Sequence, residues 1–157
     1  MKHLNSLAMA AAALIACAAA AGKTPDKENE TAKKAMETRC ATIEVKYLYP
    51  LKGPSIPTSD GYTISLKDGR LNGHLPFIGE SHSAAGYGSN DAGFTFEDCP
   101  VTISGKVSKH RHEWKFDAVS GNENVKVTVT VWDNGNADIM IIPAGRSIMR
   151  YSGELIE

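Results

Sequence analysis

Residues 125–142 read VKVTVTVWDNGNADIMII, and this segment decides the fold class. Valine stands at every second position from Val125 to Val131, which is the period of a β-strand with one buried face. Asn134-Gly135 is a two-residue turn signal, and an apolar run follows it at once. The segment therefore predicts an antiparallel hairpin whose valines face a hydrophobic core.

A two-residue turn also predicts the register of this hairpin. Counting outward from Asn134-Gly135 places Val129 opposite Met140 and Val127 opposite Ile142 on the core face. The opposite face would then be too apolar to lie in open solvent. We expect a helix, a second sheet or a ligand, in that order, to cover it. Its residues would be Thr128, Thr130, Trp132, Ala137, Ile139 and Ile141.

The same alternation predicts a strand over residues 41–49, with Tyr47 and Tyr49 on its buried face together with the apolar residues before them. This strand ends at Pro50, which begins an irregular connection rich in proline and glycine. The other predicted strands centre on residues 62–66, 71–75, 94–96, 101–103, 114–118 and 149–155.

Two local signals refine this pattern. Asp68-Gly69 predicts a second two-residue hairpin turn, which places Leu66 opposite Leu71. Residues 98–100 end in a proline and predict a bulge or bend, because proline has no N–H to donate to a central ladder. Together the patterns predict a mainly β fold, an antiparallel β-sandwich or a partly closed barrel of about eight or nine strands.

One α-helix is expected before the strands. Thr24-Pro25 can cap and start a helix, and Ala32, Ala35, Met36 and Cys40 recur at helical spacing. A helix over about residues 26–39 would lay this thin apolar stripe on the β domain. The predicted organisation is a signal peptide over 1–16, a tether with a short helix over 17–39, and a single β domain over 40–157.

The N-terminus predicts export. Lys2 and His3 precede an apolar run over residues 7–16, the arrangement of a secretion signal. Even when extended to Ala21, the run is shorter than the roughly 20 residues that cross a bilayer as a helix. We therefore expect no permanent membrane span.

Residues 14–17, Leu-Ile-Ala-Cys, resemble the lipobox of bacterial lipoproteins. This resemblance implies that Cys17 is acylated and becomes the mature N-terminus. The alternative is ordinary signal-peptidase cleavage among the small residues 18–22. We expect an exported protein whose lipid anchor holds it on a membrane, facing the periplasm or the cell surface.

Composition narrows the class of partner. Lys and Arg number 17 and Asp and Glu 18, a balance that argues against a nucleic-acid binder. Hydrophobic residues make up 42% and charged residues 22%, as in a packed soluble domain. Cys40 and Cys99 would lie in a compartment where disulfides persist, so they are either a candidate bridge or two buried thiols.

No catalytic motif emerges from the sequence. Residues 79–83, Gly-Glu-Ser-His-Ser, approach the nucleophile elbow around Ser81, but a serine stands where the second glycine is needed. His110 and His112 have a spacing that metal sites use, with His74 and His82 as further candidates, yet the flanking Lys109 and Arg111 oppose a bound cation. Asp133 and Asp138 flank the Asn134-Gly135 turn without forming a calcium loop. We expect no cofactor, no metal and no enzymatic activity.

The longest connection, residues 79–93, is the best candidate for a binding surface. Loops of this length in compact domains are usually functional or disordered. The candidate residues on it and on the preceding strand end are Phe77, Ile78, Ser81, His82 and Tyr87. We expect a non-enzymatic module that binds an envelope protein, a glycan or an apolar ligand. The alternatives are a hydrolase or metal-dependent enzyme using this loop, and a structural envelope protein.

Several short motifs occur in the order typical of one family. They are the strand end at 75–79 followed by Tyr87-Gly88, then residues 93–96, 135–137 and 146–153. With these motifs the chain resembles the exported family called domain of unknown function 4251, which is found mainly in anaerobes of the Bacteroides group. The resemblance covers roughly residues 40–157. It implies an exported, often lipid-anchored, mainly β domain, and it adds no site residue.

Overall fold

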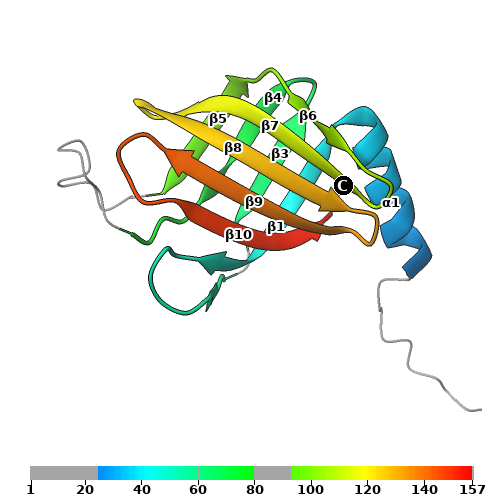
Figure 1. Cartoon of the computed structure of the whole chain (residues 1–157), viewed down its shortest axis with the longest axis horizontal. Helices are drawn as coiled ribbons and strands as arrows, with labels where there is room; N and C mark the ends of the chain where they lie inside the picture. Colours follow the sequence, from blue (N-terminus) through cyan, green and yellow to red (C-terminus); the bar gives the residue numbers. More distant parts are fainter. Residues whose placement is uncertain (1–24, 60, 80–92, 157) are drawn as a thin grey trace, which may run out of the picture.

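The structure, a computed structural model, describes residues 25–59, 61–79 and 93–156. A single antiparallel sheet curls into a half-barrel, and one α-helix lies at one end of it (Figure 1). The helix is α1 (Pro25–Thr38). The strands are β1 (Ala41–Tyr49), β2 (Ile56–Pro57), β3 (Thr63–Lys67), β4 (Arg70–Leu75), β5 (Phe94–Pro100), β6 (Ser104–Val107), β7 (Arg111–Ser120), β8 (Glu123–Trp132), β9 (Asn136–Pro143) and β10 (Met149–Leu155). The predicted fold class is confirmed as a partly closed barrel.

The sheet has the strand order β5-β4-β3-β1-β10-β9-β8-β7-β6, with the short β2 paired to β1. Most neighbours are consecutive hairpin strands. The exceptions are the pairing of β1 with β10, which joins Ile43 to Leu155 at the centre of the sheet, and the pairing of β1 with β3. The middle of the barrel therefore forms from residues that are more than 100 positions apart in the chain.

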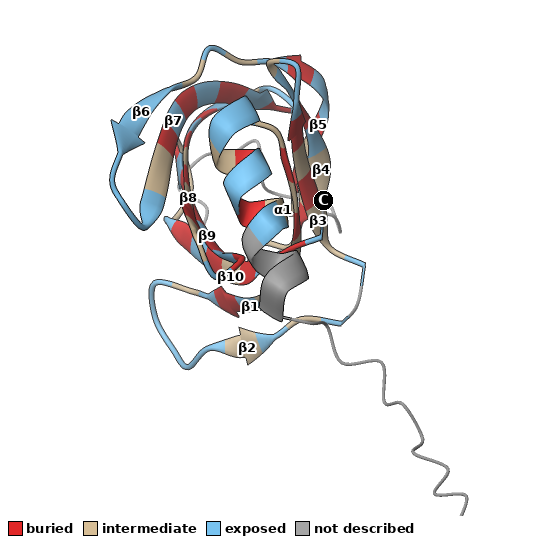
Figure 2. Ribbon diagram, turned by 90° about the vertical axis from the view of Figure 1, so that its right-hand side faces the viewer, coloured by how far each residue is buried: buried red, intermediate tan, exposed pale blue. Residues whose placement is uncertain are grey.

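The predicted helix is confirmed and packs onto the core. Ala32 and Ala35 are fully buried, and Met36 packs against the same hydrophobic cluster. Figure 2 shows α1 lying across the open end of the curled sheet, with its exposed side toward the viewer. Arg39 has φ 54°, the left-handed conformation that commonly follows the last turn of a helix. None of the described helical residues forms a segment long and apolar enough to span a membrane.

The register predicted for the hairpin at Asn134-Gly135, which β8 and β9 form, is wrong by one residue. Val129 lies opposite Ile139 and Val127 opposite Ile141, so Met140 and Ile142 point outward. All four isoleucine and valine partners are buried in the core, whereas Ile142 is 36% exposed. The second face is therefore not the apolar surface that we expected, and α1 packs on the concave side of the sheet instead.

The turn explains this shift. Gly135 has φ 84° and its N–H donates to the carbonyl of Trp132 at 3.1 Å, while Asn134 does not share the positive φ. This is a type I turn followed by a left-handed glycine, which adds one residue to the loop. Asp68 and Gly69 both have positive φ, 51° and 71°, so the hairpin of β3 and β4 has the expected two-residue turn.

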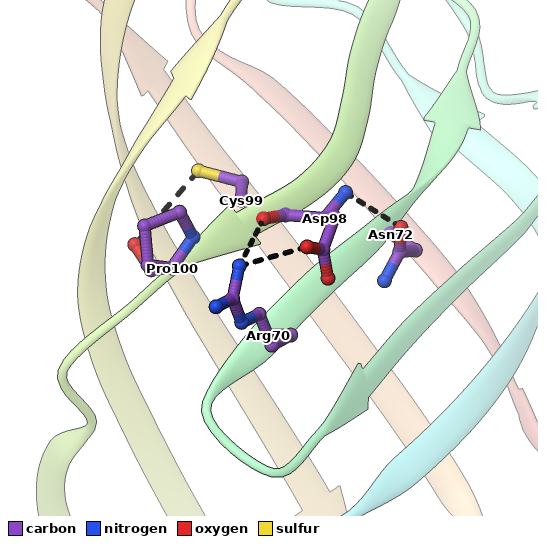
Figure 3. A network of polar contacts seen from close by, with 5 residues as sticks. All are labelled: Arg70, Asn72, Asp98, Cys99 and Pro100. Carbon is purple, nitrogen blue, oxygen red and sulfur yellow. Dashed lines mark hydrogen bonds and ion pairs between the residues drawn. The ribbon is translucent and has the colours of Figure 1, made fainter.

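That two-residue turn confirms the predicted pairing of Leu66 with Leu71. The predicted bulge near residues 98–100 is also confirmed. The ladder between β4 and β5 shifts between Leu71 and Gly73, and Asp98 takes φ 47°. Figure 3 shows how Asn72 accepts the Asp98 N–H at 2.7 Å, while Arg70 donates to the Asp98 carboxylate at 2.8 Å. The Asn72 bond satisfies a backbone N–H at the bulge, and the Arg70 bond holds the Asp98 side chain in place.

The curled sheet brings β5 close to β7, and these two strands are joined by hydrogen bonds to side chains instead of by a backbone ladder. The Thr95 N–H donates to the Ser120 hydroxyl at 3.0 Å, and the Val119 N–H donates to Cys99 Sγ at 3.4 Å. Cys99 is buried at this seam, and Cys40 lies half-buried just after α1. Both are free thiols, so the candidate disulfide is not formed in the structure.

Candidate functional site

Phe77, on the strand end predicted as a binding surface, is partly buried and packs against the core. The ring of Phe77 packs edge-on against Phe94, with centroids 5.7 Å apart, and the Arg146 guanidinium lies 4.8 Å and 4.3 Å from the two ring centroids. Glu123 accepts a hydrogen bond from Arg146 Nε at 2.8 Å and holds it there. Phe77 therefore has a packing role, in contact with Phe94 and Arg146.

The remaining residues of that predicted surface have different outcomes. Ile78 is 45% exposed and available for contact. Ser81, His82 and Tyr87, together with Cys17 of the anchor, lie outside the described residues. Their roles stay predictions.

Of the histidines singled out in the sequence, those that the structure describes, His74, His110 and His112, belong to no group of metal-ligating side chains. His110 Nδ1 lies 2.7 Å from the Asp133 carboxylate, and His74 Nδ1 lies 2.9 Å from the Thr95 hydroxyl. Within residues 25–59, 61–79 and 93–156, no three His, Cys, Asp or Glu side chains are grouped so that they could hold a metal.

The outer face of the sheet carries two parallel rows of side chains. The ladders align Tyr47, Ser152, Asp138, Thr130 and Glu113 across five neighbouring strands, β1, β10, β9, β8 and β7. Two residues along each strand, a second row runs beside the first. It consists of Tyr49, Arg150, Met140, Thr128 and Lys115.

A groove of about 430 Å³ lies over the first row at the β1 side. Tyr47 and Trp132 provide aromatic surface at its walls, and the polar side chains between them include Asp138 and Ser152. Its remaining lining residues are Lys46, Asn134, Asn136, Ala137, Gly153 and Glu154.

A second groove, of about 450 Å³, adjoins the first at Asp138, which lines both. Tyr49 and Met140 give it apolar surface, and Arg150 and Glu113 give it charge. Thr128, Thr130, Ile139 and Tyr151 complete the lining. We call the two together the outer groove.

A bulge in β1 creates part of the outer groove. Val45 pairs with Gly153 and Tyr47 pairs with Ser152, so Lys46 is an extra residue. Lys46 and Tyr47 therefore both line the groove, although they are consecutive in a strand. The prediction that Tyr47 and Tyr49 lie on the buried face is wrong, because the bulge reverses the alternation and leaves them 47% and 41% exposed. Bulges often redirect side chains next to functional sites.

Two of the carboxylates that line the outer groove, those of Asp138 and Glu113, differ in environment. Desolvation raises the pKa of Asp138, against the opposing attraction of the Arg150 guanidinium. The hydrogen bond from Lys115, 2.9 Å long, lowers the pKa of Glu113, which faces solvent. The Tyr49 hydroxyl shares a hydrogen bond of 3.2 Å with the Ser152 hydroxyl and so links the two parts of the groove. The lining offers both donors and acceptors beside aromatic rings, which suits recognition of a polar ligand with apolar faces.

Sequence reasoning missed this site. In the sequence, Asp138 flanks a turn and fits no calcium-loop pattern, and the alternation in residues 41–49 predicts that Tyr47 and Tyr49 are buried. No motif marks the outer groove, because its residues come from five strands and meet only through the ladders.

Comparisons with known proteins identify the family and the fold of this chain. The model of the domain of unknown function 4251 family matches residues 23–155, which include α1 as well as the sheet. A solved structure of a family member from Bacteroides eggerthii superposes with a TM-score of 0.58 at 19% identity, covering 82% of this chain and 87% of that one. At that identity the likeness shows the fold alone. A search of curated proteins found no match. The chain belongs to the domain of unknown function 4251 family.

Proposed function

We propose that the protein is an exported, lipid-anchored binding module of the cell envelope, and that it binds without catalysis through the outer groove. The observation that carries this proposal is the outer groove itself. Solvent-facing side chains of five strands, aromatic and polar, line two adjoining hollows there. The N-terminal signal and the lipobox-like residues 14–17 support the location.

Two further features favour binding over catalysis. The concave side of the sheet is filled by core side chains such as Phe94, Phe96 and Tyr151. The outer groove lies on the opposite, convex side and is open, so it offers contact area with little exclusion of water. Catalysis by paired carboxylates or by a nucleophile depends on such exclusion.

The proposed lipid anchor and membrane location are tested with Cys17→Ala. Because acyl chains would supply nearly all of the membrane affinity, we expect this variant to move from the membrane fraction to the soluble envelope fraction. Fractionation followed by immunoblotting measures the change. Unchanged membrane partition, or a native mature N-terminus near Gly22, would contradict the lipid anchor.

The binding surface is tested by hydroxyl-radical footprinting, which requires no knowledge of the ligand. Tyr47, Tyr49 and Met140 should be oxidised several-fold more slowly in intact cells than in the purified protein, because an occupied groove excludes the radical. Val107 and Val119 are exposed on the β6 and β7 side of the sheet and provide the control. Equal oxidation of the groove residues in both samples would contradict the proposed binding surface.

A further inference from the structure

We infer that the ligand of the outer groove is an uncharged glycan chain that lies across the strands of the sheet. This inference rests on the proposed function, since it names the chemical class that the proposed surface recognises. It depends on four properties of the outer groove: its shape, its aromatic side chains, its charge and its place in the sheet.

The shape favours an extended chain of repeating polar units. The row from Tyr47 to Glu113 crosses five strands, and with a strand spacing of about 4.8 Å it is about 19 Å long. One polar side chain follows another along this row at roughly the length of a pyranose unit. Ser152, Asp138 and Thr130 can bind hydroxyl groups in succession.

A sugar ring has an apolar face of C–H groups as well as hydroxyl groups, and the aromatic residues of the groove suit that face. Tyr47 begins the row, Tyr49 and Trp132 lie beside it, and all three are at least partly exposed. Aromatic rings offer large, rigid contact area at low cost in conformational entropy. A ligand that needs both hydroxyl partners and flat apolar platforms is a carbohydrate.

The charge of the groove favours a neutral ligand. Lys46 and Arg150 lie among three carboxylates, those of Glu113, Asp138 and Glu154. This mixture has no positive excess that would attract a polyanion and only a weak negative one. Acidic polysaccharides, phosphorylated ligands and nucleic acids are therefore disfavoured.

The place of the groove argues against a peptide or protein partner. Strands β1, β10, β9 and β8 each have neighbours on both sides, so their backbones are not available for an added strand. Protein interfaces concentrate apolar hot spots at their centre, surrounded by a polar rim. Here the order is reversed, because Asp138 lies at the centre and the aromatic rings lie at the margins.

Affinity electrophoresis of the purified full-length protein tests this inference. Native gels would contain a neutral β-glucan, a galactomannan or an α-mannan, and parallel gels would contain polygalacturonate or dextran sulfate. We expect at least one neutral polysaccharide to slow migration and the two anionic ones to have no effect. Tyr49→Ala and Asp138→Asn should each weaken the retardation about tenfold, as expected for the loss of an anchoring side chain.

Matched variants separate binding from folding. Tyr49→Phe retains the ring and should retain binding. Asp117→Asn changes an exposed carboxylate on β7 outside the outer groove and should have no effect. Circular dichroism should show native melting for all four variants, because the changed side chains lie on the outer face.

The possible failures are distinguishable. Retardation only by the anionic polysaccharides, or retardation that Tyr49→Ala and Asp138→Asn leave unchanged, would overturn the inference. No retardation by any neutral polysaccharide, combined with footprint protection of the groove in cells, would also overturn it while leaving the proposed binding function in place. Absence of that protection would count against the proposed function itself.

Discussion

Val129→Asp is expected to unfold the protein or to lower its melting temperature drastically. Val129 is 3% exposed, and its neighbours on the concave face are the apolar side chains of β7 and β9, including Trp114 and Ile139. An unpaired carboxylate at this position costs roughly 3–5 kcal/mol, against a total stability of about 5–15 kcal/mol for a typical domain. Chemical denaturation followed by circular dichroism measures the loss.

Lys126→Asp on the same strand is the control. Lys126 is exposed and lies opposite Asp117, so the change introduces like charges across the ladder in solvent. We expect a loss below about 1 kcal/mol. Equal losses for the two variants would contradict the assignment of faces in β8.

Ile141→Asp and Ile142→Asp distinguish the observed register from the one that a two-residue turn predicts. Ile141 is fully buried opposite Val127, whereas Ile142 is exposed opposite Lys126. We expect a loss of several kcal/mol for the first variant and of less than about 1 kcal/mol for the second. A larger loss for Ile142→Asp than for Ile141→Asp would instead support the register that a two-residue turn at Asn134-Gly135 predicts.

Gly153→Ala is expected to destabilise the protein strongly and to distort the outer groove. A Cβ at this position would lie 2.1 Å from the Glu44 carbonyl oxygen and 3.0 Å from the Val45 Cα, both of which are backbone atoms. Gly153 pairs with Val45, and β10 is held between β1 and β9. Relief requires a backbone shift, for which we expect a cost of roughly 1–3 kcal/mol or more. Thermal denaturation measures it.

Gly105→Ala is a matched control for this effect. Its Cβ would lie 1.9 Å from the Glu113 carbonyl oxygen, an equally close approach. Gly105 belongs to β6, however, which is an edge strand with four exposed residues and can move outward. We expect a clearly smaller loss than for Gly153→Ala. If the losses were equal, the central position of β10 would not be the reason for the sensitivity of Gly153.

The alternation in residues 125–131 was sufficient to predict a strand and its buried face. Each β-branched side chain prefers the pleated backbone, and burial of one face fixes its orientation whatever lies opposite. The helix was predictable for a similar reason. Ala32 and Ala35 form an apolar stripe at helical spacing, and both are buried.

Turn geometry set the limit of local prediction. Asp68-Gly69 and Asn134-Gly135 are nearly equivalent signals, yet the first forms a two-residue turn and the second a turn one residue longer. Both geometries are available to such dipeptides. The burial of Ile139 and Ile141 against Val129 and Val127 satisfies the core better than the alternative, and only the assembled sheet expresses that preference.

By itself the sequence determined the fold class of the protein: one helix, a series of antiparallel strands and the identity of most core residues. Those features follow from local periodicity and from turn residues. The tertiary structure alone decided that β1 pairs with β10, that a bulge opposite Gly153 turns Tyr47 outward, and that Asp138 lies between Ser152 and Thr130. The outer groove depends on these long-range pairings, because a sheet brings together residues from distant strands through backbone hydrogen bonds that carry no side-chain signature.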